Sequence, residues 1–251
     1  MAESNGKISW DRIRWYFINL LSRGDRRKHI KKQLVKAGIK ATRFDAFRKE
    51  DYFGQKEDVA LMQATPNTIG NWMSHTACIS KGIGYSDIVG VLEDDALICS
   101  DFRERIDYIE NHFHEPWDIF FLGGTFHADR AVWHPELGAD YRLTNDQKIV
   151  RMFGAFSNQG YLINSSSAEK ILAGMRRVMS QSRGSDHALI QIQPELECYA
   201  FIPGCVFQID GKSDISSGGY TQFSNFLTGL GPHAWADRME DFDYEEWERM
   251  Q

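Results

Sequence analysis

Short apolar segments alternate with amphipathic segments along this chain. The apolar ones are too short for helices and rich in β-branched and aromatic residues, which predicts strands; they cover residues 15–20, 41–45, 87–92, 118–122, 161–163 and 207–209. Helical spacing of apolar positions or a capping residue predicts helices at residues 25–37, 68–81, 101–113 and about 166–179. Strands that alternate with helices predict an α/β fold with a mainly parallel sheet, here a single domain over residues 15–216.

Residues with special backbone or capping properties set the expected helix ends. Gly38 suits the left-handed residue that closes the first helix, and Gly82 is expected to break the second. Asn67 or Thr68, then Ser100, then Ser165 or Ser166 are the expected N-terminal caps of the later helices. In a sheet of this class, ligands bind beyond the carboxyl ends of the strands, so the chemistry is expected there.

Composition narrows the class of protein further. The 251 residues are 42% hydrophobic and 13% aromatic, which suffices for one substantial core and excludes a disordered chain. No apolar run approaches the roughly 18 residues that cross a bilayer, and the first ten residues lack the apolar segment of a signal peptide. The four cysteines have no metal-ligand spacing and are too sparse for a disulfide scaffold. We therefore expect a cytoplasmic globular protein with no transmembrane segment.

Charge is distributed unevenly around a formal net charge of −6. Residues 7–49 hold 14 Lys or Arg and three acidic residues, whereas residues 235–251 hold seven acidic and two basic residues. The basic half is either a solvated surface or a binding surface for an anion. That anion could be a nucleotide diphosphate, a lipid head group in peripheral contact with a membrane, or a nucleic acid. The negative net charge weighs against the nucleic acid.

Three consecutive carboxylates, Glu93, Asp94 and Asp95, directly follow the most apolar predicted strand. Like charges so close repel one another unless a cation compensates them. Oxygen ligands suit Mg²⁺ or Mn²⁺, which commonly bridge to substrate phosphates. The alternative is an acidic turn that faces solvent.

A second candidate site is the turn from the first predicted strand into the basic helix. Backbone N–H groups at a helix start, together with Arg23 and Arg26, would hold an anion. The dinucleotide fingerprint GxGxxG is absent there. Two weaker features are His75, which as a lone helical histidine is more often structural, and Gly154, which can simply mark close packing.

These segments together resemble glycosyltransferase family 25, the lipopolysaccharide and collagen galactosyltransferase group. The resemblance rests on six segments in the family's order: INLxxRxDRR at 18–27, GxxxSH at 70–75, LEDD at 92–95, WDxxxLG at 117–123, the stretch 154–172 with Tyr161, Ala168 and Leu172, which is similar to the family's GAxxYxIxxxxAxKLL, and Gln208 with SDI at 213–215. They span about residues 15–216. A leader at 1–14 and an acidic C-terminal tail at 217–251 lie outside the resemblance.

The resemblance implies a GT-A-type enzyme that transfers galactose or glucose from a UDP-sugar to an acceptor hydroxyl, with inversion. It implies Mn²⁺ or Mg²⁺ on Asp95, with Glu93 on the metal or the ribose and Asp94 fixing the loop or touching the donor sugar. It places Asn19, Arg23 and Arg26 at the nucleotide, and Ser74, His75 and Gly154 in the donor site. Asp186, before a short helix, is the candidate base, with an ordinary helix cap as the alternative.

Three adjacent acids cannot surround a metal that prefers six oxygens, so a later ligand is expected from Gln208 or Asp214. The implied acceptor is a glycan or glycolipid such as lipopolysaccharide. Two other functions stay open: a module that binds a nucleotide or glycan without turnover, and an enzyme that glycosylates hydroxymethylated nucleic-acid bases. Retention of all three acids argues against the first.

Overall fold

An eight-stranded sheet runs through the computed structural model, which describes residues 8–51, 66–124, 134–146, 148–154, 156, 158–182, 184–202, 204–209, 211–212 and 220–221. The strand order is β2-β1-β3-β8-β5-β9-β7-β6. The strands are β1 (Ile13–Asn19), β2 (Ala41–Asp45), β3 (Ile88–Glu93), β5 (Ile119–Phe121), β6 (Tyr141–Leu143), β7 (Ile149–Met152), β8 (Gly160–Asn164) and β9 (Cys198–Phe201). Their pairings make six strands run in one direction and β7 and β8 in the other. The sheet is therefore mixed and mainly parallel, as predicted.

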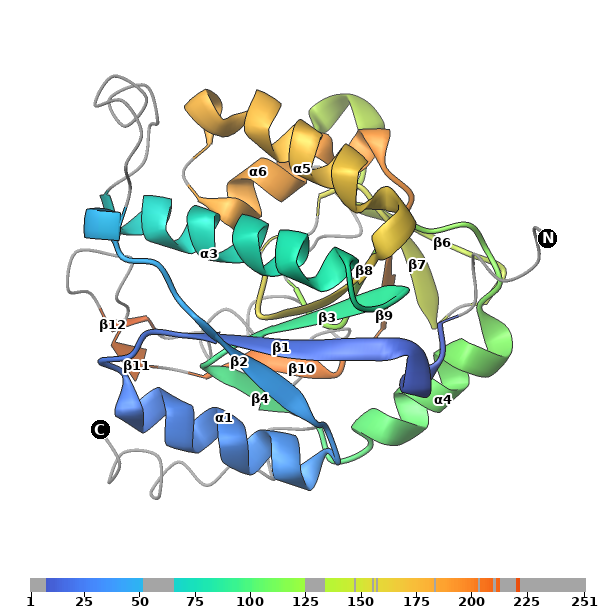
Figure 1. Ribbon diagram of the computed structural model, residues 1–251. Helices are drawn as coiled ribbons and strands as arrows, with labels where there is room; N and C mark the ends of the chain where they lie inside the picture. The colour runs from blue at the N-terminus through green and yellow to red at the C-terminus, as the bar shows by residue number, and fades with distance from the viewer. Residues whose placement is uncertain are drawn as a thin grey trace.

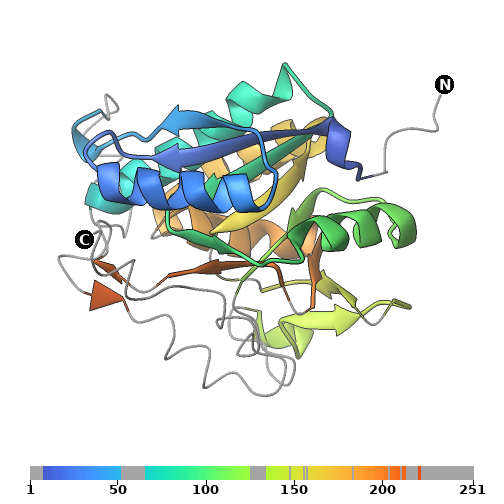
Figure 2. The ribbon, with the colours of Figure 1, turned by 90° about the horizontal axis from the view of Figure 1, so that it is seen from below.

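Helices cover both faces of this sheet (Figure 1). α1 (Gly24–Lys36) and α4 (Phe102–His112) lie on one face, onto which Figure 2 looks. α3 (Pro66–Ile83), α5 (Ala168–Arg177) and α6 (Ser185–Ile192) lie on the other. Two short antiparallel pairs join β4 (Ala96–Ile98) to β10 (Val206–Gln208) and β11 (Gly211–Lys212) to β12 (Tyr220–Thr221). Single 3₁₀ turns lie at Trp10–Arg12, Lys49–Asp51, Pro135–Leu137, Ser165–Ser167, Met179–Gln181 and Gln193–Glu195. The layers confirm the predicted α/β class.

The alternation of side chains along β1 divides the buried residues into two cores. Trp15 and Phe17 pack in the core under α1 and α4, while Tyr16 and Ile18 pack in the core under α3, α5 and α6. Successive residues of a strand point to opposite faces, so a strand covered on both faces must be apolar throughout. This explains why the first predicted strand is a continuous apolar run.

The helix ends agree with the sequence in part. Gly38 follows α1 with a φ of 67°, which confirms the expected left-handed residue. Three capping predictions are wrong, and Gly82, expected to break the second helix, lies inside the last turn of α3. Asn67 and Thr68 lie inside α3, which already begins at Pro66. Asp101, not Ser100, precedes α4, and the side chain of Asn164, rather than that of Ser165 or Ser166, accepts a hydrogen bond from a backbone N–H of the following turn.

The domain begins earlier than the predicted boundary at Trp15. Ile8 is fully buried in the core under α1 and α4, Trp10 packs against that core, and β1 already starts at Ile13. Part of the predicted leader is thus integral to the domain. Apart from β12, the predicted C-terminal tail lies outside the described residues. Within the described part of the chain, no helix has both the length and the apolar character needed to cross a membrane.

Gly123, just beyond β5, offers a test of the packing next to β10. A Cβ atom there would lie 1.7 Å from the backbone oxygen of Val206, so Gly123→Ala must displace the backbone of β10. We expect a loss of about 1–3 kcal/mol in the free energy of unfolding, measured by chemical denaturation. Gly84→Ala is the control, because a Cβ there meets nothing within 4 Å. Equal stability of the Gly123 variant and the parent would contradict this packing.

Candidate active site

The carboxyl ends of the adjacent parallel strands β1 and β3 bring the candidate residues together. Ile18 is paired with Glu93 in the register, so Asn19 at the end of β1 lies beside the acidic segment that ends β3. Glu93 is the last residue of β3, and Asp94 and Asp95 form the turn that leads directly into β4. The acids thus lie at the edge of the sheet where ligands of this fold class bind.

Asp94 and Asp95 are both buried, and one guanidinium contacts both of them. Nη1 of Arg26, in the first turn of α1, donates to Asp95 Oδ2 at 2.8 Å and to Asp94 Oδ1 at 3.2 Å. The amide of Asn19 donates to Asp94 Oδ2 at 2.7 Å and to the backbone oxygen of Arg23 at 3.0 Å. Asn19 and Arg26, which the resemblance places at the nucleotide, thus contact the acids, and Asp94 ties this turn to β1 and α1.

Burial dominates the electrostatics of this pair. It raises the pKa of Asp94 to about 7, and the neighbouring charge of Asp95 adds to the rise. Arg26 and the hydrogen bonds from Asn19 and Arg26 oppose that rise, because they favour the carboxylate form of Asp94. In this structure Arg26 is therefore the principal counter-charge of the two acids.

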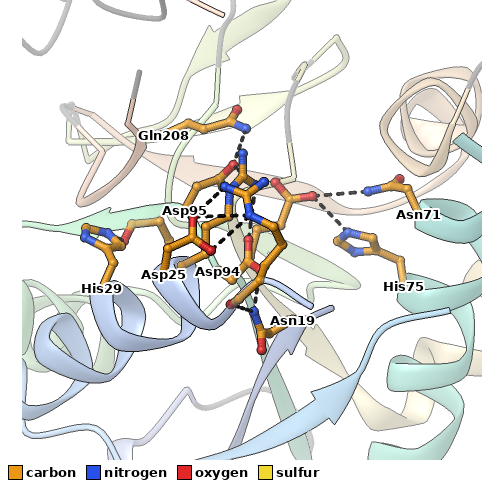
Figure 3. A network of polar contacts seen from close by, with 12 residues as sticks. Asn19, Asp25, His29, Asn71, His75, Asp94, Asp95 and Gln208 are labelled. Carbon is orange, nitrogen blue, oxygen red and sulfur yellow. Dashed lines mark hydrogen bonds and ion pairs between the residues drawn. The ribbon is translucent and has the colours of Figure 1, made fainter. Parts of the chain in front are cut away.

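Gln208 reaches the acidic pair from β10. Its amide nitrogen lies 3.1 Å from Asp95 Oδ2, because β10 pairs with β4 and Gln208 is opposite Ala96 (Figure 3). The predicted approach of this late residue to the acids is thus observed, although it comes about through strand pairing with β4, which the sequence reading did not identify. The other oxygen of Asp95, Oδ1, is buried and has no hydrogen-bond partner among the described residues.

Glu93 contacts a different set of residues from its two acidic neighbours. Its Oε1 lies 3.1 Å from Nε2 of His75 and 3.3 Å from the amide nitrogen of Asn71, both on α3. Figure 3 shows these two residues on the side of the cluster opposite to Asp25 and His29 of α1. The three consecutive acids therefore do not converge on one point, and no group of three metal-ligating side chains occurs among the described residues.

His75 is completely buried and orients Glu93. Its Nδ1 lies 2.7 Å from the hydroxyl of Tyr161 on β8, which is also completely buried. A carboxylate only accepts hydrogen bonds, so Nε2 of His75 donates to Glu93, and Nδ1 faces the Tyr161 hydroxyl. Burial raises the pKa of Tyr161 well above its usual value, which keeps this hydroxyl protonated.

Asn71 connects Glu93 to the start of α6. Its side-chain oxygen accepts from the hydroxyl of Ser185 at 2.5 Å and from the Ser185 backbone N–H at 3.3 Å. Asp186 follows Ser185 in the first turn of α6, rather than in a loop before the helix, and its Oδ1 accepts from the N–H of His187 at 2.8 Å. The candidate base therefore lies next to the site, in a helix-start position that also suits the capping alternative.

The remaining predicted residues make different contacts, although the backbone of Arg23 accepts from Asn19. Arg23 pairs with Asp25 at 2.7 Å, and Gly154 packs against Asp140 after β7. The hydroxyl of Ser74 donates to the Gly70 backbone oxygen and accepts from the Phe47 N–H. Asp214 lies outside the described residues.

Sequence reasoning missed several members of the network, namely Arg43, Tyr161, Ser185 and the hydrogen bonds of Asn71 to Glu93 and Ser185. Arg43 donates to both the side-chain and the backbone oxygen of Asn19, at 3.0 and 3.1 Å. Arg43 could not be recognised from the residues around it in the sequence, because its contact with Asn19 depends on the pairing of β2 with β1. Asn71 precedes His75 by one helical turn, a spacing that places both side chains on one face of α3 and could have been recognised.

Comparison with solved structures finds glycosyltransferases of low sequence identity. The apo form of GlyE from Streptococcus pneumoniae TIGR4 is 12% identical with a TM-score of 0.39, over 74% of this chain and 44% of that chain. A glycosyltransferase involved in glycosylation of the major capsid of PBCV-1 is 6% identical with a TM-score of 0.44, over 80% of this chain and 94% of that one. The chain thus spans less than half the length of the GlyE chain. No curated protein matches it.

A comparison with models of protein families gives a match over more than half of the chain. The profile described as glycosyltransferase family 25 (LPS biosynthesis protein) matches residues 13–183. The match covers more than half of the chain and includes β1, α1, α3, β3 and the acidic turn, which are the elements that build the network described above. The chain belongs to glycosyltransferase family 25.

Proposed function

We propose that this protein transfers a hexose, galactose or glucose, from a UDP-sugar to an acceptor hydroxyl, with inversion and with the aid of Mn²⁺ or Mg²⁺. The observation that carries the proposal is the buried acidic pair Asp94–Asp95, which lies at the carboxyl end of β3 in contact with Arg26. Membership of the family supplies the class of reaction. The chemical requirement is to stabilise the negative charge that develops on a departing nucleotide diphosphate.

The α1 side of the site suits the diphosphate. Arg26 lies in the first turn of α1, where backbone N–H groups and the helix dipole favour an anion. Asn19, held by Arg43 and Asp94, completes this side at the end of β1. These residues would bind and orient the nucleotide end of the donor. The case for Arg23 at the nucleotide is weaker, because its guanidinium already forms an ion pair with Asp25.

The donor set at Asp95 fits a divalent cation. Oδ1 of Asp95 is buried without a hydrogen-bond partner among the described residues, and the Gln208 side chain lies against Oδ2. Mg²⁺ and Mn²⁺ sites in phosphate-transfer proteins often use one or two carboxylates and take their other ligands from water and phosphates. Asp95 would hold the cation, with Gln208 and Asp214 as further candidates, and the cation would act as a Lewis acid at the diphosphate.

Inversion requires a base for the acceptor hydroxyl. Asp186 is the candidate, because α6 begins beside Asn71 and is connected through it to Glu93. Asp186 is partly exposed, and one of its carboxylate oxygens accepts a hydrogen bond from the N–H of His187.

The acceptor we propose is a glycan or glycolipid, as in lipopolysaccharide synthesis, and the location we propose is the cytoplasm. The outer face of α1 carries the exposed lysines Lys28, Lys31, Lys32 and Lys36. Such a basic surface would favour peripheral contact with an anionic membrane that holds a glycolipid. The same surface would serve a nucleic-acid acceptor, in which case the affinity for the acceptor would fall steeply with salt.

The direct test is release of UDP from UDP-galactose and from UDP-glucose, with and without Mn²⁺ and a glycan acceptor. A thermal-shift screen of UDP-, GDP- and CMP-sugars identifies the donor first, since a bound ligand raises the melting temperature. Stabilisation by a UDP-sugar without turnover under any condition would instead support the binding module.

Asp95→Asn should reduce turnover more than tenfold and leave the fold intact. The amide retains the shape of the side chain but not the charge that a cation needs, while Arg26 keeps Asp94 as its partner. Steady-state kinetics measure the effect, and Asp107→Asn on the exposed face of α4 is the matched control. A variant with more than about a tenth of the parent activity has lost less than about 1.4 kcal/mol of transition-state stabilisation, which would refute the assignment.

Arg26→Ala should weaken UDP binding by about 1.5–3 kcal/mol, the range for a hydrogen bond to a charged group. Calorimetric titration with UDP measures this. Lys28→Ala, two residues later and exposed, removes the same charge without a contact to the acids. Thermal unfolding of both variants is needed alongside, because loss of Arg26 leaves two buried acids without their counter-charge. Equal UDP affinity in the two variants would show that Arg26 serves the fold alone.

A further inference from the structure

The two sides of the acidic segment differ in chemical character. On the α1 side, Asp94 and Asp95 meet the guanidinium of Arg26, which suits charged groups. On the side of α3 and α6, Glu93 meets the amide of Asn71 and the imidazole of His75. No Arg or Lys of the described residues contacts Glu93, so this side lacks the permanent positive charge that Arg26 supplies on the other.

A continuous chain of hydrogen bonds extends from Glu93 along this second side. Asn71 contacts Glu93 and accepts from Ser185, and the hydroxyl of Ser185 accepts from the amide of Asn158 at 3.2 Å. The backbone of the neighbouring Gln159 is tied to the same place, because its backbone oxygen accepts from the N–H of Glu93 at 3.0 Å. The Gln159 side chain instead lies against β10, where its amide nitrogen is 3.5 Å from the backbone oxygen of Val206. Residues from α3, β3, α6 and the segment before β8 thus meet in one polar cluster.

One buried acceptor in this cluster has no hydrogen-bond partner among the described residues. Asn158 is only 4% exposed, yet its Oδ1 makes no hydrogen bond there. A buried acceptor without a hydrogen bond costs about 1–3 kcal/mol, so a ligand that supplies a donor at this point would be favoured. Glu93 has a similar capacity, since its side chain is 18% exposed and both of its observed contacts are made by Oε1.

We infer that this cluster is a hydroxyl-binding subsite, in which Glu93 and Asn158 accept hydrogen bonds from a hexose. The inference rests on the proposed function and assigns the second side of the site to the sugar, with the diphosphate on the α1 side. The ligand chemistry is that of a neutral polyol: several O–H donors, no charge, and a fixed spacing that a side-chain amide and a carboxylate recognise. That hexose is either the one carried by the donor or one in the acceptor.

His75 and Tyr161 act as positioning residues in this subsite. The order Tyr161 hydroxyl, His75 ring and Glu93 carboxylate fixes Oε1, so the second oxygen of Glu93 is held in a defined direction. Loss of the Tyr161 hydroxyl would remove the contact that holds the ring of His75, so the Glu93 carboxylate would no longer be held in one orientation. A role in folding alone would lower the melting temperature without any change in sugar recognition.

The experiment compares the affinity for UDP with the affinity for a UDP-hexose, in the presence of Mn²⁺, for the full chain and its variants. We expect Glu93→Gln to leave the Kd of UDP within about twofold and to weaken UDP-galactose or UDP-glucose by about tenfold, since one charged hydrogen bond is lost. Glu104→Gln, on the exposed face of α4, is the matched control. Tyr161→Phe should show the same selective loss to a smaller degree. Asn158→Ala provides a second, independent removal of an acceptor.

The outcomes separate the sources of the sugar. Selective loss of UDP-hexose affinity supports the donor hexose, whereas unchanged donor affinity with a raised acceptor KM supports a hexose of the acceptor. Equal weakening of UDP and UDP-hexose in Glu93→Gln would overturn the inference and assign Glu93 to the nucleotide or the cation. Unchanged recognition of both substrates in Glu93→Gln and Asn158→Ala would overturn it as well. Failure of the parent protein to bind any UDP compound would count against the proposed function itself.

Discussion

The contact of Arg26 with Asp94 and Asp95 is the interaction on which this site depends. Two buried carboxylates in successive positions repel each other and lose their hydration, and removal of the partner of such a buried pair costs about 3–5 kcal/mol. Arg26 compensates both acids with one guanidinium nitrogen. Because Arg26 belongs to the first turn of α1, the same contact fixes the start of that helix beside the ends of β1 and β3. The acidic turn is thus stable in the protein before any ligand arrives.

The local elements were largely predictable, because each depends on a pattern within a few residues. The apolar run that became β1 and the left-handed Gly38 after α1 are of this kind. The acidic turn was also recognisable as a site, since three acids after a buried strand are unusual. What each acid contacts was not predictable from composition and motifs, because its partners come from α1, α3 and β10. The role of Gln208 depends on the pairing of β10 with β4, a short strand that gave no separate signal.

The errors share a physical cause. Ser100 and the serines after β8 have the right chemistry for a cap, but Asp101 directly precedes α4, and Asn164 directly precedes the 3₁₀ turn in which Ser165 and Ser166 lie. In each case the residue type was informative and its exact neighbour was decided by tertiary structure, which a pattern along the chain does not contain.

The division of the acids between two sides of the sheet follows from the period of a strand. Val89 and Val91 of β3 pack in the core under α3, α5 and α6, whereas Leu92 packs in the core under α1 and α4. Side chains alternate along a strand, so Glu93 continues the face of Val91 and reaches α3, and Asp94 continues the face of Leu92 and reaches α1. One apolar strand followed by consecutive acids therefore delivers a carboxylate to each face of the sheet edge.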